Sequence, residues 1–250
     1  MTFWQGVLVA VAGIWAGTIN TVVGSGTLVT FPVLLGIGLP PVTANVTNTV
    51  GLFPGSLTGA YGYRRELTGQ GRRAAILAVA SALGAVVGAV LLLELPAGAF
   101  HAIVPALIVL ALVLVVFGQR MTRWLVARGR GANERVTPAL WLAMLGTGVY
   151  GGYFGAAQGV LMMGFLGLFL SESVQRQNGL KNLLAGLANL VAAIVFAFTP
   201  HIDWAAAGLV AAGSILGGLL GARIGRRMSP AVLRATIVVV GIAALVKLLA

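Results

Sequence analysis

The chain of 250 residues is 59% hydrophobic and 8% charged, with a mean hydropathy of +1.01. A soluble protein keeps about a quarter of its residues charged, so this composition excludes a water-soluble domain and predicts a multi-pass protein of the lipid bilayer. The net charge of +11 does not indicate a nucleic-acid partner, because the basic residues lie in short loops between apolar runs, as the positive-inside rule expects. The absence of cysteine excludes disulfides and thiol chemistry.

The apolar runs define the expected elements in chain order. Residues 3–35 are too long for one membrane span and are interrupted by glycines and small polar residues, which indicates two short helices with a break between them. Spans of about 20 residues follow at 43–63, 74–93 and 98–118. A second interrupted stretch covers 138–170, and further spans are expected at 182–199, 204–222 and 231–249.

The distribution of basic residues predicts how the chain crosses the membrane. If 138–170 forms a hairpin that enters and returns, 15 of the 16 basic residues lie on the cytoplasmic side. A single crossing at 138–170 would instead place the arginines at 223–227 outside. The hairpin is therefore the better interpretation, and the cytoplasmic (inner) membrane is the expected location.

The two halves of the chain repeat a weak pattern. Val46-Thr47-Asn48 aligns with Leu180-Lys181-Asn182, and the glycine-containing run at 83–88 aligns with that at 216–221. The cationic loop 64–73 aligns with 199–203, which carries no Lys or Arg, so the halves have opposite orientation. We expect two inverted repeats of four or five segments each, at 1–118 and 138–250, joined by a basic cytoplasmic linker at 119–137. Chance similarity between Gly- and Ala-rich spans is the alternative, and the charge pattern disfavours it.

The sequence offers little for catalysis. The five acidic residues lie at segment ends or in loops, and zinc-protease, nucleophile-elbow and nucleotide-binding motifs are absent. The two histidines are isolated from each other along the chain and are better read as interface residues than as a metal pair. We therefore expect no enzyme activity, no cofactor and no metal.

Uncharged polar residues flank both predicted helix breaks. Asn20, Thr21 and Ser25 surround the first break, and Gln158 stands beside glycines in the second. Helix breaks at membrane depth expose backbone N–H groups, and free helix N-termini carry partial positive charge, so such a site suits a small oxyanion. The alternative is helix packing through small residues, with Ser and Thr bonding their own backbone.

A second polar set begins the segments that follow the breaks. Thr47 and Asn48 in the first half correspond to Lys181 and Asn182 in the second, so a pseudo-twofold axis would bring them to one central cavity. Lys181 has two interpretations that the sequence leaves open: a cation facing the site, or an anchor whose side chain extends to the cytoplasmic surface.

These blocks resemble the sulfite exporter TauE/SafE family, also called the 4-toluene sulfonate uptake permeases. The resemblance rests on residues 13–26, Phe31-Pro32, 38–41 and 44–48 in the first half, and on 151–159 and 178–198 in the second. It departs from the family at Ala156, Ala157 and Gln158, where the pattern is often richer in glycine. The resemblance implies an inner-membrane permease for sulfite or organosulfonates and leaves the direction of transport open.

We therefore expect an all-α membrane protein of eight to ten segments that transports a small anion by alternating access. Two other functions stay open: a passive anion channel, and a membrane assembly subunit without transport activity. The expected partners are the anion and the bilayer, and the sequence is compatible with a homo-oligomer without requiring one.

Overall fold

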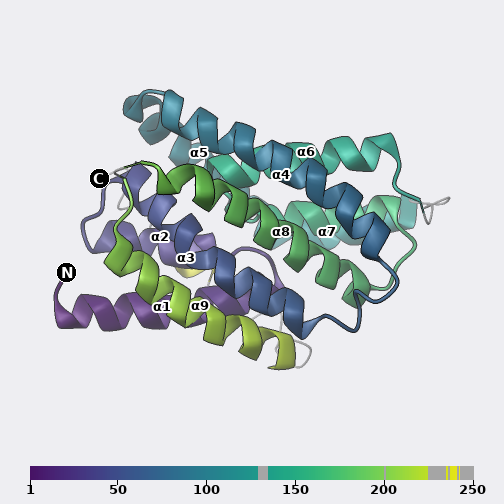
Figure 1. Ribbon diagram of the computed structural model, residues 1–250, viewed down its shortest axis with the longest axis horizontal. Coiled ribbons are helices and arrows are strands. Elements are labelled where there is room, and N and C mark those ends of the chain that lie inside the picture. The colour runs from purple at the N-terminus through teal and green to yellow at the C-terminus, as the bar shows by residue number, and fades with distance from the viewer. Residues whose placement is uncertain (129–134, 200, 225–234, 236, 241, 243–250) are drawn as a thin grey trace.

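The computed structural model describes residues 1–128, 135–199, 201–224, 235, 237–240 and 242, and the regular elements within them are all helices. The helices run along the long axis of the molecule (Figure 1). In chain order they are α1 (Phe3–Val22), α2 (Thr27–Gly36), α3 (Pro41–Gly62), α4 (Gly71–Glu94), α5 (Ala97–Arg128), α6 (Pro138–Tyr153), α7 (Gln158–Phe169), α8 (Val174–Ala197) and α9 (Trp204–Ile224). The predicted all-α class is confirmed.

Both glycine-rich stretches fold as helix pairs with a break, as predicted, although α1 with its 20 residues is longer than the short helix expected. The first is α1 and α2 on either side of a break at 23–26, and the second is α6 and α7 on either side of a break at 154–157. The predicted spans 43–63, 74–93, 98–118 and 204–222 correspond to α3, α4, α5 and α9. Helix α5 continues through Arg128 into the predicted linker, and most of the predicted last span at 231–249 lies outside the described residues.

The sequence placed the start of one span too late. Helix α8 begins at Val174 rather than at 182, and the Ser173 hydroxyl caps it by accepting from the Arg176 N–H. Its first two turns look like a loop in the sequence because they are polar. In the structure Gln177, Asn178 and Lys181 are buried, so this polarity faces the protein interior.

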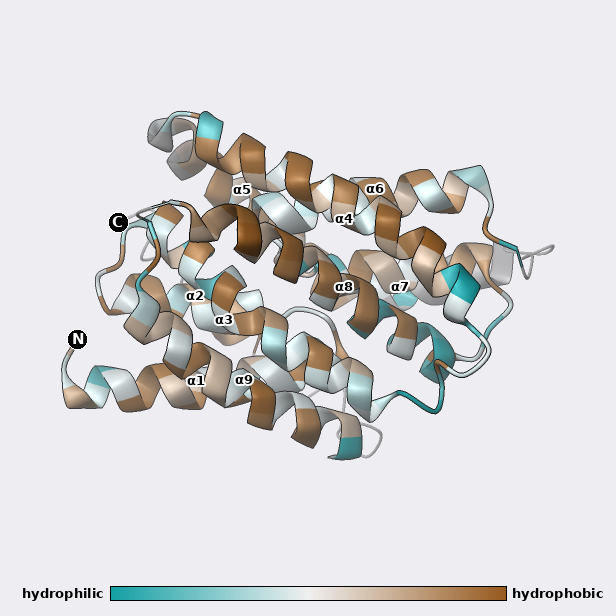
Figure 2. Cartoon of the chain, viewed as in Figure 1, coloured by the Kyte–Doolittle hydropathy of each residue, from teal (hydrophilic) through white to brown (hydrophobic). Residues whose placement is uncertain are grey.

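Five of the described helices are long and apolar enough to cross a membrane. Large apolar side chains such as Val79, Leu83 and Val87 of α4 are exposed on the protein surface, where lipid can cover them. Hydrophobic residues dominate the helices in Figure 2. The candidate spans are Phe3–Val22, Gly71–Glu94, Gly98–Gly118, Val174–Ala197 and Trp204–Arg223.

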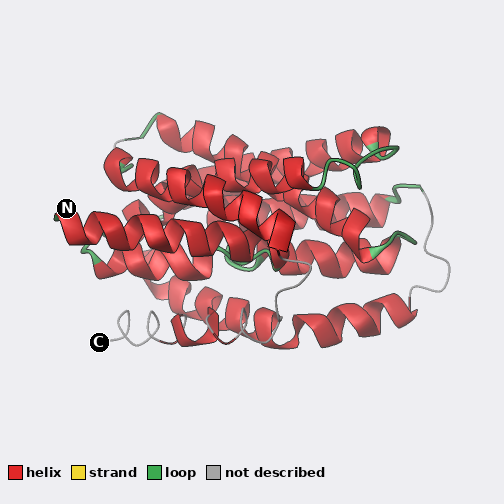
Figure 3. Cartoon of the chain, turned by 90° about the horizontal axis from the view of Figure 1, so that it is seen from below, coloured by secondary structure: helices red, strands yellow, loops and turns green. Residues whose placement is uncertain are grey.

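Apart from the two breaks inside the bundle, the loops gather at its two ends (Figure 3). One end, here called the basic end, comprises residues 62–73, 135–137, 170–176 and 222–223. Contacts tie these segments together: Arg73 pairs with Glu172 at 2.6 Å, and Arg176 donates to the carbonyl of Thr68 at 3.2 Å. At the opposite end, Pro40–Thr43, Leu92, Leu93, Leu95, Gly98 and His201 line a common cavity.

Small residues bring helices from different parts of the chain into backbone contact. Helix α1 packs on α9, and α4 packs on α6. A Cβ atom added at Gly17 would overlap the Ser214 backbone, and one at Gly152 would overlap the Ala85 backbone. Gly13 likewise meets Val210, and Gly148 meets Ser81. In both pairs a step of four residues along one helix matches a step of four residues in the same direction along the other, so the paired helices are parallel. Because α9 and α4 run in opposite directions between the two ends, α1 and α6 also run oppositely.

The two helix pairs that contain breaks are hairpins that enter from opposite ends. The pair α1–α2 begins and ends at the end opposite the basic one, and α6–α7 begins and ends at the basic end. Helices α3 and α8 pack against each other between them. The fold thus places the tips of the two hairpins inside the bundle.

Candidate functional site

The tips of the two hairpins meet through their backbones. The Gly159 N–H donates to the Gly24 carbonyl at 3.0 Å. Gly24 has φ +88°, a left-handed conformation that favours glycine, and Gly155 and Ala157 in the second break also have positive φ. A Cβ on Gly24 would overlap the Cα of Gly159. This contact is therefore specific to glycine on both sides.

Lys181 lies beside this contact and points into the protein. Its residue is 1% exposed, and its ammonium donates to the carbonyls of Asn20 at 3.0 Å and Thr21 at 2.9 Å. These carbonyls belong to the last turn of α1, where helix C-termini carry partial negative charge. Lys181 makes no ion pair with a carboxylate among the described residues. The Lys181 side chain therefore faces the protein interior and does not extend to the cytoplasmic surface.

Two amides of α8 bind the same turn of α1. Asn182 and Asn178 donate to the Thr21 carbonyl at 3.1 and 3.3 Å. In the other half, Asn45 of α3 donates to the Tyr153 carbonyl at the end of α6, at 2.8 Å. Each hairpin's first helix therefore ends on an asparagine from the other half of the chain.

Asn48 and Asn20 hold the first hairpin in shape. Asn48 donates to the Thr27 hydroxyl at 3.1 Å and accepts from the Thr30 hydroxyl. Asn20 donates to the Ser56 hydroxyl at 2.8 Å and accepts from the Gly26 N–H at 3.3 Å, which closes the turn at the break.

Gln158 plays a similar part in the second hairpin. Its side chain packs against Gly151 and donates to the Thr147 carbonyl of α6 at 3.0 Å. It thereby ties the first turn of α7 back to α6. Its amide faces the hairpin that carries it.

Several buried polar atoms near the breaks have no hydrogen-bond partner among the described residues. They are the hydroxyls of Thr21, Ser25 and Tyr153 and the amide oxygens of Asn45 and Asn178. A buried polar group without a partner costs free energy unless a ligand or water satisfies it. Their hydrogen-bonding capacity is not satisfied by the described residues.

The structure brings most of the predicted site residues together and separates one from them. Asn20, Thr21 and Ser25 of the first hairpin lie in one region with Lys181, Asn182 and the start of α7. Thr47 accepts from the Asp203 N–H at 3.0 Å, so its hydroxyl is engaged with the segment before α9. Its neighbour Asn48 faces the first hairpin instead.

Asn45 and Asn178, which belong to the same polar segment starts as the predicted site residues, also contact the hairpins. Their signal was present in the sequence, because each lies one helical turn before a predicted site residue, at Asn48 and Asn182, and so on the same face. The described residues contain no group of three or more His, Cys, Asp or Glu side chains that could hold a metal ion.

Comparison with known proteins shows curated relatives that align with this chain over most of their own length. A probable membrane transporter protein, ORF9, from Sinorhizobium is 31% identical over 96% of this chain and 90% of its own. A probable membrane transporter protein from Haemophilus influenzae is 24% identical over 91% of this chain and 88% of its own length. The probable membrane transporter protein YfcA of Escherichia coli K12 is 25% identical over 98% of this chain and 89% of its own length. No solved structure is a significant match.

Fold, buried polar junction and relatives together define a multi-pass membrane transporter. The family model of the sulfite exporter TauE/SafE matches residues 9–248. The chain belongs to this family, which confirms the resemblance seen in the sequence.

Proposed function

We propose that the protein is a secondary transporter of small sulfur-containing anions such as sulfite or organosulfonates. The observation that carries the proposal is the Lys181 ammonium, buried at the junction of the two hairpin tips without a carboxylate partner among the described residues. A buried cation is costly unless a charge of opposite sign compensates it. An anionic cargo would supply that charge each time it binds.

The surroundings of Lys181 also favour an anion. Helices α2 and α7 begin at the two breaks, and helix N-termini attract negative charge. The hydroxyls of Thr21 and Ser25 are available as neutral donors. The identity of the cargo as a sulfur oxyanion is supported by the family to which the chain belongs.

Alternating access follows in this proposal from the way the helices pack. The inverted repeat is supported by the matching pairs α1–α9 and α4–α6, in which α1 and α6 run oppositely. Each pair joins helices from both halves of the chain. The moving bodies in this scheme are therefore α1, α3 and α9 against α4, α6 and α8, with the α3–α8 contact as the sliding surface. Each moving body therefore contains helices from both halves of the sequence.

The test is anion flux into liposomes that contain the purified full-length protein. We expect sulfite uptake that saturates with concentration and that exceeds uptake of sulfate, phosphate and chloride. Lys181→Met should lower this uptake by more than tenfold. The control Arg65→Gln removes an exposed cation outside the junction and should leave uptake unchanged.

Each remaining outcome has a defined meaning. Flux that never saturates would favour a passive anion channel. No flux and no thermal stabilisation by sulfite, thiosulfate or sulfoacetate would reject the sulfur cargo, since a bound ligand must raise the melting temperature. Unchanged flux in Lys181→Met would remove the lysine from the site.

A further inference from the structure

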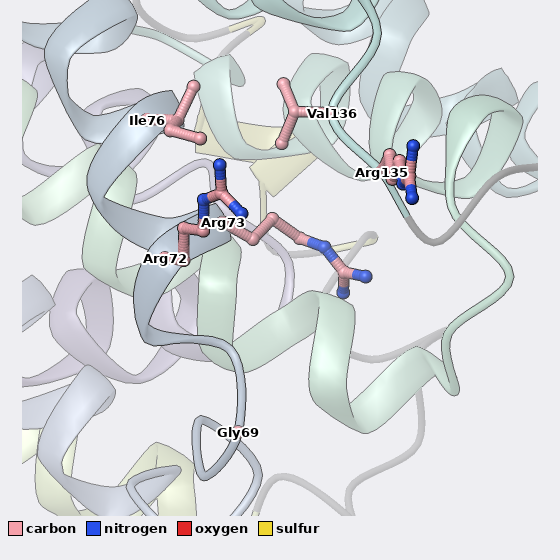
Figure 4. Close-up of a pocket in the computed structure, with 6 residues that line it drawn as sticks. All are labelled: Gly69, Arg72, Arg73, Ile76, Arg135 and Val136. Carbon is pink, nitrogen blue, oxygen red and sulfur yellow. The ribbon is translucent and has the colours of Figure 1, made fainter.

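A cavity of about 570 Å³ opens at the basic end of the molecule, away from the hairpin tips. It lies between the start of α4 and the segment that precedes α6. Figure 4 shows Arg72, Arg73 and Ile76 on α4, and Arg135 and Val136 on the segment before α6, so each side of the cavity carries both arginine and aliphatic side chains. Its lining residues are Gly69, Arg72, Arg73, Ile76, Arg135 and Val136.

The charge around this cavity is strongly positive. Glu172 pairs with both Arg73 and Arg176, each at 2.6 Å, so one carboxylate is shared by two guanidinium groups. Arg72 and Arg135 are exposed and make no ion pair among the described residues. Among the described residues, the cavity therefore presents Arg72 and Arg135 without an ion pair, beside two further guanidinium groups that share Glu172.

The Arg73 side chain at this cavity is held in place by hydrogen bonds to its neighbours. Arg73 donates to the Gln70 amide oxygen at 3.1 Å in addition to its bond with Glu172. Gln70 is itself buried, and its amide nitrogen donates to the carbonyls of Glu66 at 2.9 Å and Arg176 at 3.4 Å. A fixed guanidinium loses little conformational entropy when it binds an anion. This part of the cavity is pre-organised.

The apolar part of the cavity lining on α4 continues into the lipid-facing surface. Ile76 lines the cavity and is 38% exposed. Along α4, Val79, Leu83 and Val87 extend the same exposed apolar surface toward the membrane interior. An inorganic anion would use only the arginines, whereas a phospholipid would place its phosphate on the arginines and its acyl chains on α4.

We propose that this cavity binds the phosphate headgroup of an anionic phospholipid from the leaflet at the basic end. Arg72 and Arg135 contact the phosphate directly, and Arg73 adds charge from a fixed position. The site is separate from the proposed cargo site, and its test needs no transport.

The experiment measures the melting temperature of the full-length protein in neutral detergent during titration with phosphatidylglycerol. Phosphatidylcholine carries the same phosphate without net charge, and inorganic phosphate carries the charge without acyl chains. We expect phosphatidylglycerol alone to raise the melting temperature in a saturable way. Each arginine near an anionic lipid surface contributes about a fivefold change in affinity, so Arg72→Gln combined with Arg135→Gln should weaken the apparent Kd by more than tenfold.

Arg65→Gln is the matched control, because Arg65 is an exposed arginine at the same end that does not line the cavity. It should change the apparent Kd by less than twofold. Equal stabilisation by phosphatidylcholine, or equal weakening in the control, would overturn the proposal. Equal stabilisation by inorganic phosphate would also overturn it, because the occupant would then be a free anion.

Discussion

Gly24 shows at the scale of one residue how the site depends on the absence of a side chain. It combines a positive φ with a backbone contact to Gly159 across the two hairpin tips. Alanine at this position would be strained in its backbone and would also collide with Gly159.

Gly24→Ala should therefore lower the free energy of unfolding by about 2 kcal/mol or more, seen as a lower melting temperature in detergent. Gly38→Ala is the control, because Gly38 has φ +100° but no atom within 4 Å of the added Cβ. It should pay only the backbone cost of about 1 kcal/mol. Equal losses at the two positions would show that the contact with Gly159 contributes nothing.

Glu172 is the residue that joins the loops of the basic end. Burial alone would raise the pKa of its carboxyl, but hydrogen bonds and charges from Arg73 and Arg176 outweigh burial and hold that pKa below its usual value. A lowered pKa in the folded state adds stability above the unfolded pKa, and this stability is lost as the pH falls through the folded pKa.

Glu172→Gln should therefore lower stability at pH 7 by about 1 kcal/mol after allowance for solvent screening. The difference from the unchanged protein should shrink as the pH falls below about 4. Melting temperatures measured across pH test this. Glu94→Gln, at an exposed residue without an ion pair among the described residues, is the control and should cost little stability at pH 7. A pH-independent loss for Glu172→Gln would contradict the ionised pair.

At the scale of helices, the main feature is the exchange of end contacts between the halves of the chain. Asn178 of α8 binds the end of α1, and Asn45 of α3 binds the end of α6. Each asparagine satisfies a carbonyl that the helix itself leaves without a partner. Both hairpins are thereby anchored to a central helix from the other half.

Asn178→Ala and Asn45→Ala should each cost about 1 kcal/mol of stability, because each leaves a buried carbonyl with fewer donors. Asn45→Ala should cost at least as much, since Thr21 retains Lys181 and Asn182 as donors. Asn189→Ala on α8 is the control, at a partly buried residue without a side-chain hydrogen bond among the described residues. Melting temperatures of the three variants test this prediction. A larger loss of stability for Asn189→Ala than for the other two would contradict the role of Asn45 and Asn178 as donors to the helix ends.

At the scale of the whole molecule, the two ends differ in charge, which predicts the orientation in the membrane. The basic end should face the cytoplasm. Because the chain contains no cysteine, single cysteines can report on each end without a background.

His201→Cys should react with a membrane-impermeant thiol reagent added to intact cells, and Thr68→Cys should react only after the membrane is opened. Both residues are exposed and lie at opposite ends of the bundle. The reverse pattern of labelling would invert the orientation and would place the proposed lipid site in the outer leaflet.

The sequence by itself determined the class of the protein, the hairpin at 138–170 and most helix positions. These follow from local properties: apolar runs long enough to span a bilayer, and glycines and polar residues that interrupt them. It also located the polar residues beside both breaks. The start of α8 was missed because its polar first turns face inward, and local polarity does not distinguish an interior face from a loop.

Only the tertiary structure decided which polar residues meet. Thr47 and Asn48 are neighbours in the chain, yet one binds the segment before α9 and the other binds α2. Lys181 is buried because α1 ends beside it, which depends on a contact between residues 160 positions apart. Such contacts arise from the packing of whole helices, and the residues that make them carry no mark of it in their local sequence.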